Sequence, residues 1–191
     1  LSWVPPSPNM PYLHTLWQYP GACLIEGTQL SEGRGTPLPF EIVGAPWIDA
    51  VALAEQLNSD EWGERLGARF RPHIFHPTDS KWRGEYCHGI QVYRMNEIRW
   101  RPLEVWLGII LTIRCLYPEQ FAWLPSQDGM QHFDRLIGTE WVRREIEAAA
   151  ELGTPVNEVL ARFAVEWADD CHAFGLQRQP YLLYLDESRL C

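Results

Sequence analysis

Proline and glycine punctuate the first 46 residues so densely that they limit the possible folds more than any other feature. Residues 1–20 alone contain five prolines: Pro5, Pro6, Pro8, Pro11 and Pro20. Proline has a fixed φ and no backbone N–H, so it disrupts the interior of a regular helix. We therefore predict that residues 1–20 form an extended, tightly turning segment without a regular helix.

The next residues combine two short apolar runs with a long connection between them. Residues 22–25 are apolar and residues 40–43 are apolar except for Glu41, and both runs are predicted to be short strands. Residues 26–39 hold three glycines and two prolines, which predicts a loop. An ordinary connection is shorter and carries fewer functional groups, so this loop is the first candidate for a functional site.

The middle of the chain contains both strand and helix patterns. Residues 68–76 and 88–95 alternate apolar and polar side chains, which predicts strands. Pro72 confines the first of them to a sheet edge or a bulge. Helices are predicted over residues 48–57 and 102–117 from the spacing of their apolar residues.

Two more helices are predicted towards the C-terminus. Thr139 can cap a helix whose buried face includes Val142 and Ile146. A second helix opens at Pro155 and carries apolar residues at three- and four-residue intervals. Residues 181–185 are predicted to form a terminal strand. Because strands and helices follow no regular βαβ order, the predicted class is α+β, a small mixed sheet with several packed helices.

The composition is that of a globular domain, with 46% hydrophobic and 21% charged residues in 191. A formal charge of −9 argues against nucleic acid or an anionic membrane as the main partner, because both require a basic surface. The longest apolar run, residues 105–113, is shorter than the roughly 20 residues that cross a bilayer, so we predict a buried helix. Five cysteines without CxxC spacing predict neither a zinc ribbon nor a disulfide framework.

The loop is dense in functional groups. Six candidate side chains lie within eleven positions: Glu26, Thr28, Ser31, Glu32, Arg34 and Thr36. This stretch resembles the signature of the NamZ-type family of exo-β-N-acetylmuramidases. The resemblance continues in order along the whole chain, through WVPPSPNMP, FRPHIFHPTDSKWRGEYCHGIQ, RPLEVWLGIILTIRCLYP, HFDRLIGTEW and PYLLY.

The resemblance implies a fold and a function. Family members remove N-acetylmuramic acid (MurNAc) from the non-reducing end of peptidoglycan fragments. They combine a Rossmann-like N-terminal lobe with a smaller α+β C-terminal lobe, and the active site lies in the cleft between. Residues 1–191 match the C-terminal lobe only, so part of the catalytic machinery is expected in the lobe absent from this chain. A chain that starts at Leu1 in a proline-rich stretch is expected to be a processed or excised piece.

The implied partners are peptidoglycan fragments containing MurNAc linked to N-acetylglucosamine (GlcNAc), and the missing lobe. The family implies no cofactor and a periplasmic or secreted location. Two alternatives from other classes stay open. The chain could be a non-catalytic module that binds muropeptide sugars, or a purely structural or assembly lobe.

Glu26 and Glu32 are the candidate catalytic residues, because glycosidases usually need two carboxyl groups. The alternative for each is a carboxylate that fixes the loop by accepting backbone N–H bonds. Arg34 is the candidate for binding the lactyl carboxylate of MurNAc, since a guanidinium can hold a carboxylate through two parallel hydrogen bonds. The alternative for Arg34 is an ion pair with Glu26 or Glu32.

Other residues complete the candidate site. Further substrate-binding candidates are Asn9, Thr28, Ser31 and Thr36, and Asn9 could instead be a turn element. Lys81 could meet a sugar or a carboxylate, although a solvated lysine is the ordinary expectation. Five residues carry side chains that can bind a metal: His73, His76, Asp79, Cys87 and His88. Their spacing matches no standard zinc motif, so we expect no metal. Four tryptophans are candidate sugar platforms: Trp3, Trp47, Trp82 and Trp100.

Overall fold

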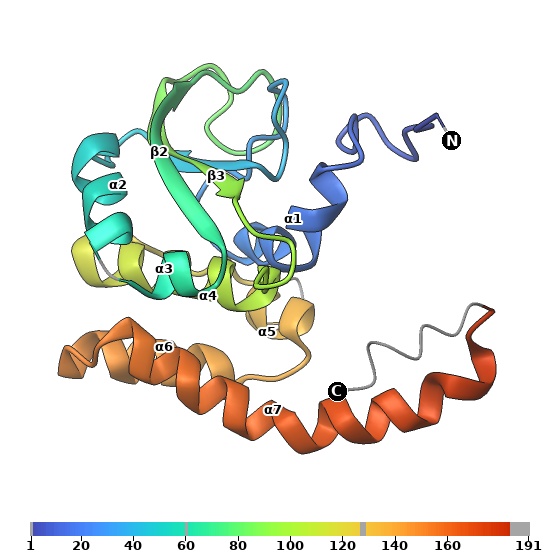
Figure 1. Ribbon diagram of the computed structural model, residues 1–191. Helices are drawn as coiled ribbons and strands as arrows, with labels where there is room; N and C mark the ends of the chain where they lie inside the picture. Colours follow the sequence, from blue (N-terminus) through green and yellow to red (C-terminus); the bar gives the residue numbers. More distant parts are fainter. Residues whose placement is uncertain (1, 60, 127–128, 184–191) are drawn as a thin grey trace.

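The computed structural model describes residues 2–59, 61–126 and 129–183, and it shows an α+β fold (Figure 1). A small sheet lies at one end, helix α4 (Pro102–Leu116) runs through the middle, and the last helices cover the other side. Residues 105–113 of α4 are all buried, as the sequence predicted. This helix is the centre of the core, because both the N-terminal and the C-terminal helices pack against it.

The sheet has three strands in the order β1-β3-β2, and both pairings are antiparallel. The strands are β1 (Ile42–Ala45), β2 (Ala68–Phe75) and β3 (Cys87–Arg94). The prediction of a mixed sheet was therefore wrong, while the edge position of the proline-containing strand β2 is confirmed. Helix α2 (Ala50–Ser59) packs on β2 and β3. Its range differs by two residues at each end from the helix predicted over residues 48–57.

The prediction of no helix before residue 20 was wrong. Helix α1 (Thr15–Ala22) contains Pro20, and it continues into the 3₁₀ helix η1 (Cys23–Gly27) where a strand was expected. The cost of Pro20 is confined to one short helix, and packing against α4 outweighs it. The contact is close: a Cβ on Gly21 would lie only 2.2 Å from the carbonyl oxygen of Pro102.

The C-terminal helices agree with the sequence pattern. Helix α6 (Trp141–Leu152) buries the predicted face, and its first N–H donates to the Thr139 hydroxyl at 3.3 Å. Helix α7 (Val156–Arg178) buries only residues in its first third, and its second half projects beyond the body (Figure 1). The short helices α3 (Trp62–Arg65) and α5 (His132–Ile137) complete the set of α-helices in the described ranges.

The predicted terminal strand at residues 181–185 is not observed in its described part. Tyr181 ends the 3₁₀ helix η2 (Gln179–Tyr181), and Leu182 and Leu183 form no strand. The remaining two residues of that prediction lie outside the described residues. Across the described ranges, no helix combines the length and the apolar character that crossing a membrane requires.

Candidate functional site

Four charged side chains from three segments meet at the loop predicted over residues 26–39, which we call the glycine-rich loop. Glu26 lies in η1, Glu32 and Arg34 lie in the loop itself, and Lys81 lies in the connection between β2 and β3. We call these four residues the charge network. It holds two carboxylates and two cations, so the formal charges within it cancel.

Arg34 joins the two candidate catalytic carboxylates. Its Nε donates to Glu26 Oε1 at 3.0 Å and lies 3.3 Å from Glu32 Oε1, and its Nη2 also contacts Glu26. The ion-pair alternative for Arg34 is therefore what the structure contains. The side chain is 28% exposed, and Nη1 makes no hydrogen bond to any described residue. The outer edge of the guanidinium thus keeps donors for a further anion.

Glu32 is buried at the inner side of the charge network, with 1% exposure. The Ser80 hydroxyl donates to its Oε1 at 2.9 Å, and Lys81 Nζ lies 2.8 Å from its Oε2. A buried carboxylate is costly unless it is paired and hydrogen-bonded, and both conditions are met here. Glu26 is more accessible, with 23% exposure of its side chain.

Lys81 is a largely enclosed member of the charge network, with 20% of its side chain exposed, so the expectation of a solvated lysine was wrong. Besides Glu32, its Nζ donates to the carbonyl oxygens of Ile25 and Thr28, each at 2.9 Å. The ammonium group therefore donates to two carbonyl oxygens and forms an ion pair with Glu32, whose Oε2 is buried and accepts no hydrogen bond from a described group. Burial lowers the pKa of Lys81 from its ordinary value, and the neighbouring Glu32 opposes that shift.

The three candidate hydroxyls of the loop make hydrogen bonds within the loop. Thr28 Oγ1 donates to Ile25 O at 2.9 Å, and Thr36 Oγ1 donates to Gly33 O at 2.6 Å. The Ser31 hydroxyl accepts from the N–H of Gly33 at 3.2 Å. Thr28 and Ser31 are buried, so in this structure their hydroxyls hold the loop in shape. A substrate contact for these three residues stays a prediction.

Left-handed backbone conformations gather around the charge network. Three non-glycine residues in the described ranges have a positive φ: Phe40 at 63°, Ser80 at 64° and Trp82 at 60°. The Phe40 ring lies 5.0 Å from the guanidinium carbon of Arg34, and Trp82 Nε1 donates to Gln29 O at 2.7 Å. Such conformations cost free energy and persist only where surrounding contacts impose them.

Two titratable side chains next to Glu26 were missed by sequence reasoning. Burial raises the pKa of Tyr19, and the Glu26 carboxylate adds to that shift. Burial also raises the pKa of the Cys23 thiol, again with a contribution from Glu26. Their position depends on helix α1 and η1, which the sequence pattern did not reveal. Ser80 was not selected, and Lys81 was expected to be solvated, because a polar connection between two strands is ordinarily exposed.

The remaining candidates lie apart from the charge network or have other partners. The Asn9 N–H donates to Ser7 Oγ at 3.2 Å, while its side-chain amide makes no hydrogen bond to a described residue. Its role in substrate binding stays a prediction. Of the four candidate tryptophans, Trp82 bonds the loop, whereas Trp100 is buried and donates to Trp17 O. In the described ranges no cluster of metal-ligating side chains is found.

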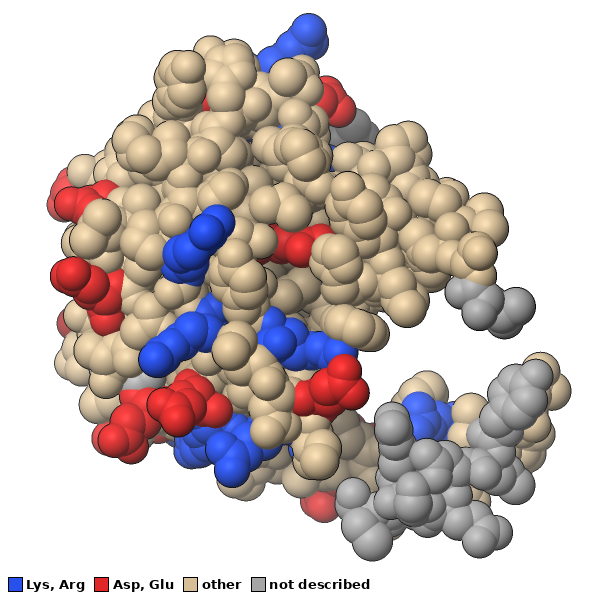
Figure 2. All heavy atoms as spheres, turned by 45° about the horizontal axis from the view of Figure 1, so that its top comes forward, with Lys and Arg blue, Asp and Glu red and all other residues tan. Residues whose placement is uncertain are grey.

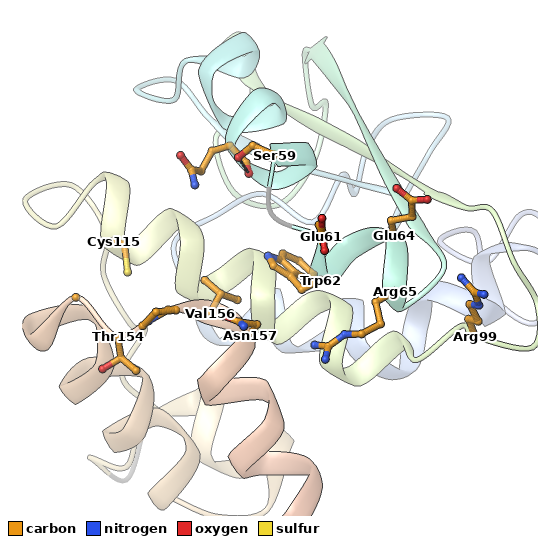
Figure 3. Close-up of a pocket in the computed structure, with 13 residues that line it drawn as sticks. Ser59, Glu61, Trp62, Glu64, Arg65, Arg99, Cys115, Thr154, Val156 and Asn157 are labelled. Atoms are coloured by element: carbon orange, nitrogen blue, oxygen red, sulfur yellow. Dashed lines mark hydrogen bonds between the residues drawn. The ribbon is translucent and has the colours of Figure 1, made fainter.

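A cavity of about 1130 Å³ lies elsewhere in the fold. It is bounded by α2 and α3 on one side and by the turn between α6 and α7 on the other (Figure 3). Trp62, Arg65 and Asn157 are among the residues around it, and no member of the charge network lines it. The glycine-rich loop therefore presents its accessible groups, Glu26 and Arg34, at a surface and not inside that cavity.

Comparison with known proteins gives one family. Residues 17–184 match the family described as "Exo-beta-N-acetylmuramidase NamZ, C-terminal". The chain is 40% identical over 184 residues to the "Peptidoglycan beta-N-acetylmuramidase NamZ" of Bacillus subtilis (strain 168). That alignment covers 96% of this chain but only 41% of the Bacillus protein.

Two solved structures are similar over nearly the whole chain. Both are DUF1343 family proteins from Bacteroides fragilis. The first has a TM-score of 0.77 and 25% identity, and covers 97% of this chain and 46% of that protein. The second has a TM-score of 0.62 and 27% identity, with 95% and 44% covered. The chain therefore spans less than half the length of these relatives.

Proposed function

Because the chain belongs to the family of NamZ C-terminal domains, we propose that it is one lobe of a glycoside hydrolase that removes MurNAc from the non-reducing end of peptidoglycan glycans. The observation that carries this proposal is the match over residues 17–184, which includes the whole glycine-rich loop. The chain covers 41% of the Bacillus relative, which is consistent with a further lobe outside this chain. A Rossmann-like fold for that lobe is part of the proposal. Peptidoglycan as substrate would place the enzyme in the periplasm or outside the cell.

In this proposal Arg34 recognises the group that distinguishes MurNAc from GlcNAc. MurNAc carries a lactyl ether with a carboxylate, and GlcNAc does not. The Nε edge of Arg34 is occupied by Glu26, and the Nη1 side is open. A fixed guanidinium loses little conformational freedom on binding, which favours a carboxylate in a defined orientation.

Glu26 is the carboxylate of this lobe that would reach the substrate, since Glu32 is buried. Both contact one nitrogen of Arg34, so their oxygens are close enough to act as a coupled pair. A direct catalytic role for Glu32 requires the charge network to open when the substrate binds. Without that opening, Glu32 acts by holding Arg34 in place.

The second candidate function is a sugar-binding module without catalysis. It is favoured by the complete pairing of both glutamates, because a general acid or base has to exchange a proton during each turnover. It is also consistent with a chain that spans under half of its relatives. Both functions use the same loop and predict MurNAc binding. Only the hydrolase predicts turnover.

The test compares the chain alone with a chimera in which it replaces the matching part of the Bacillus protein. A chromogenic MurNAc–GlcNAc substrate and MurNAc binding are measured for both, with Glu26→Gln as the matched control. We expect turnover by the chimera, a large loss in Glu26→Gln, and binding by the chain alone. Binding without turnover by a folded chimera would favour the sugar-binding module. A chain that does not bind MurNAc would overturn both functions and favour an assembly lobe.

A further inference from the structure

The connection between β2 and β3 crosses the glycine-rich loop and fits closely against it. Thr78 donates to Gly35 O through both its N–H, at 3.1 Å, and its hydroxyl, at 2.8 Å. A Cβ on Gly35 would lie 2.3 Å from the backbone nitrogen of Asp79, so the two segments touch without room for a side chain. The three residues that follow, Ser80, Lys81 and Trp82, reach into the loop, and we call them the clamp.

Each member of the clamp bonds a different part of the loop. Ser80 donates to the Glu32 carboxylate, Lys81 bonds the same carboxylate and two carbonyls, and Trp82 donates to the carbonyl of Gln29. Ser80 and Trp82 hold the left-handed φ values described above, on both sides of Lys81. Two strained residues that flank Lys81 indicate that the placement of its side chain is imposed by the fold.

Lys81 is also the only lysine in the sequence, which contains 16 basic residues in total. The ordinary place for a lysine is the solvated surface, yet this side chain is only 20% exposed, donates to two carbonyl oxygens and pairs with a buried carboxylate. A lysine needed only for solubility would not be fixed by three such contacts. The residue type is informative as well, because an ammonium group is a compact charge that fits among three converging oxygens.

The charge balance gives Lys81 a specific task. Without it, Glu26 and Glu32 would place two negative charges against the single positive charge of Arg34. Arg34 would then be drawn inward to Glu32, and the net negative charge would repel an anionic ligand. With Lys81 paired to Glu32, the contact of Arg34 with Glu32 is a longer one, at 3.3 Å.

We propose that Lys81 is a positioning residue, which neutralises buried Glu32 so that the outer edge of Arg34 stays available for a carboxylate-bearing sugar. The proposal rests on the function proposed above for Arg34, and it adds a residue that never touches the substrate. Lys81 acts through Glu32 and Arg34, so its removal should change selectivity for the charged sugar more than binding of sugars in general.

The test uses the 191-residue chain in four forms: wild type, Lys81→Met, Glu32→Gln, and the double variant Glu32→Gln/Lys81→Met. The double variant removes both charges of the buried pair, so the formal balance around Arg34 is restored. Lys81→Gln is the second choice if Lys81→Met does not fold, since its amide keeps a donor for the carbonyls of Ile25 and Thr28. All measurements are made well below the melting temperature of each variant.

Two NMR signals report on the environments of Lys81 and Arg34 in the absence of a ligand. The single lysine gives one side-chain ammonium resonance in ¹⁵N-lysine-labelled protein, and slow exchange of its protons is expected because the group donates to two carbonyl oxygens and is paired with Glu32. The Arg34 Nε–H resonance, identified by its loss in Arg34→Lys, should shift in Lys81→Met and return towards the wild-type position in the double variant. A neutral Lys81 amine would overturn the proposal, and so would an Arg34 resonance that has the same position in Lys81→Met as in wild type.

The ratio of the affinities for free MurNAc and free GlcNAc measures the selectivity. We expect Lys81→Met to bind MurNAc about tenfold more weakly, with GlcNAc binding nearly unchanged, and the double variant to recover most of the loss. Equal losses for both sugars would make Lys81 a general scaffold residue and refute the positioning role. If wild-type protein binds neither sugar, the function proposed for Arg34 fails, while the two NMR signals still decide whether Lys81 positions Arg34.

Discussion

At the scale of single residues, Arg34 is the side chain on which the proposed selectivity depends. It is the only cation of the glycine-rich loop, and its partners leave its Nη1 side open. In the chimera, Arg34→Lys should lose roughly 10- to 150-fold in kcat/KM for a muramide, or about 1.5–3 kcal/mol. A lysine keeps the charge but cannot form two parallel hydrogen bonds.

The control for Arg34→Lys is a glucosaminide analogue, which lacks the lactyl carboxylate. Its turnover, however slow, should be nearly the same in the variant and the unchanged chimera. Melting temperatures are compared first, since Arg34 also ties Glu26 to Glu32. Similar losses on both substrates would assign Arg34 to the scaffold of the loop.

Glu41 offers a pH-dependent prediction away from the charge network. It accepts a hydrogen bond from Thr15 at 2.9 Å and lies 3.1 Å from His14 Nε2. Burial raises the pKa of Glu41, while Thr15 and His14 oppose the shift. A carboxyl group with a raised pKa in the folded state stabilises the fold at low pH, and this contribution is lost as pH rises through that value.

Glu41→Gln removes the buried charge and keeps an acceptor for Thr15. The variant should therefore melt at a higher temperature than wild type at pH 7.5, with the difference shrinking towards pH 4.5. Thermal unfolding followed by circular dichroism across this range gives the comparison. A wild type that is more stable than Glu41→Gln at pH 7.5 would mean that the His14 contact outweighs the burial of Glu41.

At the scale of elements, the contact between α1 and α4 depends on one glycine. A methyl group on Gly21 would lie 2.2 Å from Pro102 O and 2.8 Å from the Trp106 ring, so Gly21→Ala should be destabilising by about 2 kcal/mol or more. Gly175 in α7 is the matched control, because nothing lies within 4 Å of its added Cβ. Gly175→Ala should be neutral or stabilising by about 0.5–1 kcal/mol. Denaturant unfolding of both variants decides, and equal stabilities would show that α1 is not held closely against α4.

Elements with a strong local pattern were predictable from the sequence. Helix α4 begins at Pro102 and has nine consecutive buried residues. The strands β2 and β3 form where they were predicted, although burial along them departs from strict alternation. The helical register around Pro20 was not predictable, because it depends on how closely Gly21 approaches another helix. Local propensity argued for a strand at residues 22–25, and tertiary packing produced a 3₁₀ helix there.

The candidate site was predictable in part. The density of charged residues among glycines located the loop, and the alternative of an ion pair for Arg34 was anticipated. The clamp was not anticipated, since the pairing of Lys81 with Glu32 joins residues far apart in the sequence. A pattern within one segment carries no information about which distant segment folds over it.

At the scale of the whole molecule, the segment up to Trp17, which we call the N-terminal arm, projects from the body (Figures 1 and 2). It carries no Lys, Arg, Asp or Glu, and neither do the residues that follow it up to position 25. Several large apolar side chains are exposed there: Val4, Tyr12, Leu13, Leu16 and Trp17. The second half of α7 projects on the same side and exposes Phe174 and Leu176. Exposed apolar residues in this number are typical of a surface that meets another protein part, which here would be the second lobe.

The double variant Leu13→Ser/Leu16→Ser tests whether the N-terminal arm behaves as an apolar surface. It should bind less of a hydrophobic dye such as anilinonaphthalene sulfonate than the unchanged chain, with a similar melting temperature because both side chains are partly exposed. In the chimera the arm should be covered, so the same substitutions should weaken the packing of the two lobes. Dye binding that does not respond to the substitutions would argue against a covered arm.

The central claim is that this lobe helps to remove MurNAc from the non-reducing end, and product analysis tests it most directly. The chimera is incubated with the defined tetrasaccharide MurNAc–GlcNAc–MurNAc–GlcNAc, and the products are separated and identified by mass spectrometry. If this lobe takes part in removing MurNAc, free MurNAc and the trisaccharide GlcNAc–MurNAc–GlcNAc should be the first products. Release of disaccharides, or of GlcNAc before MurNAc, would contradict it.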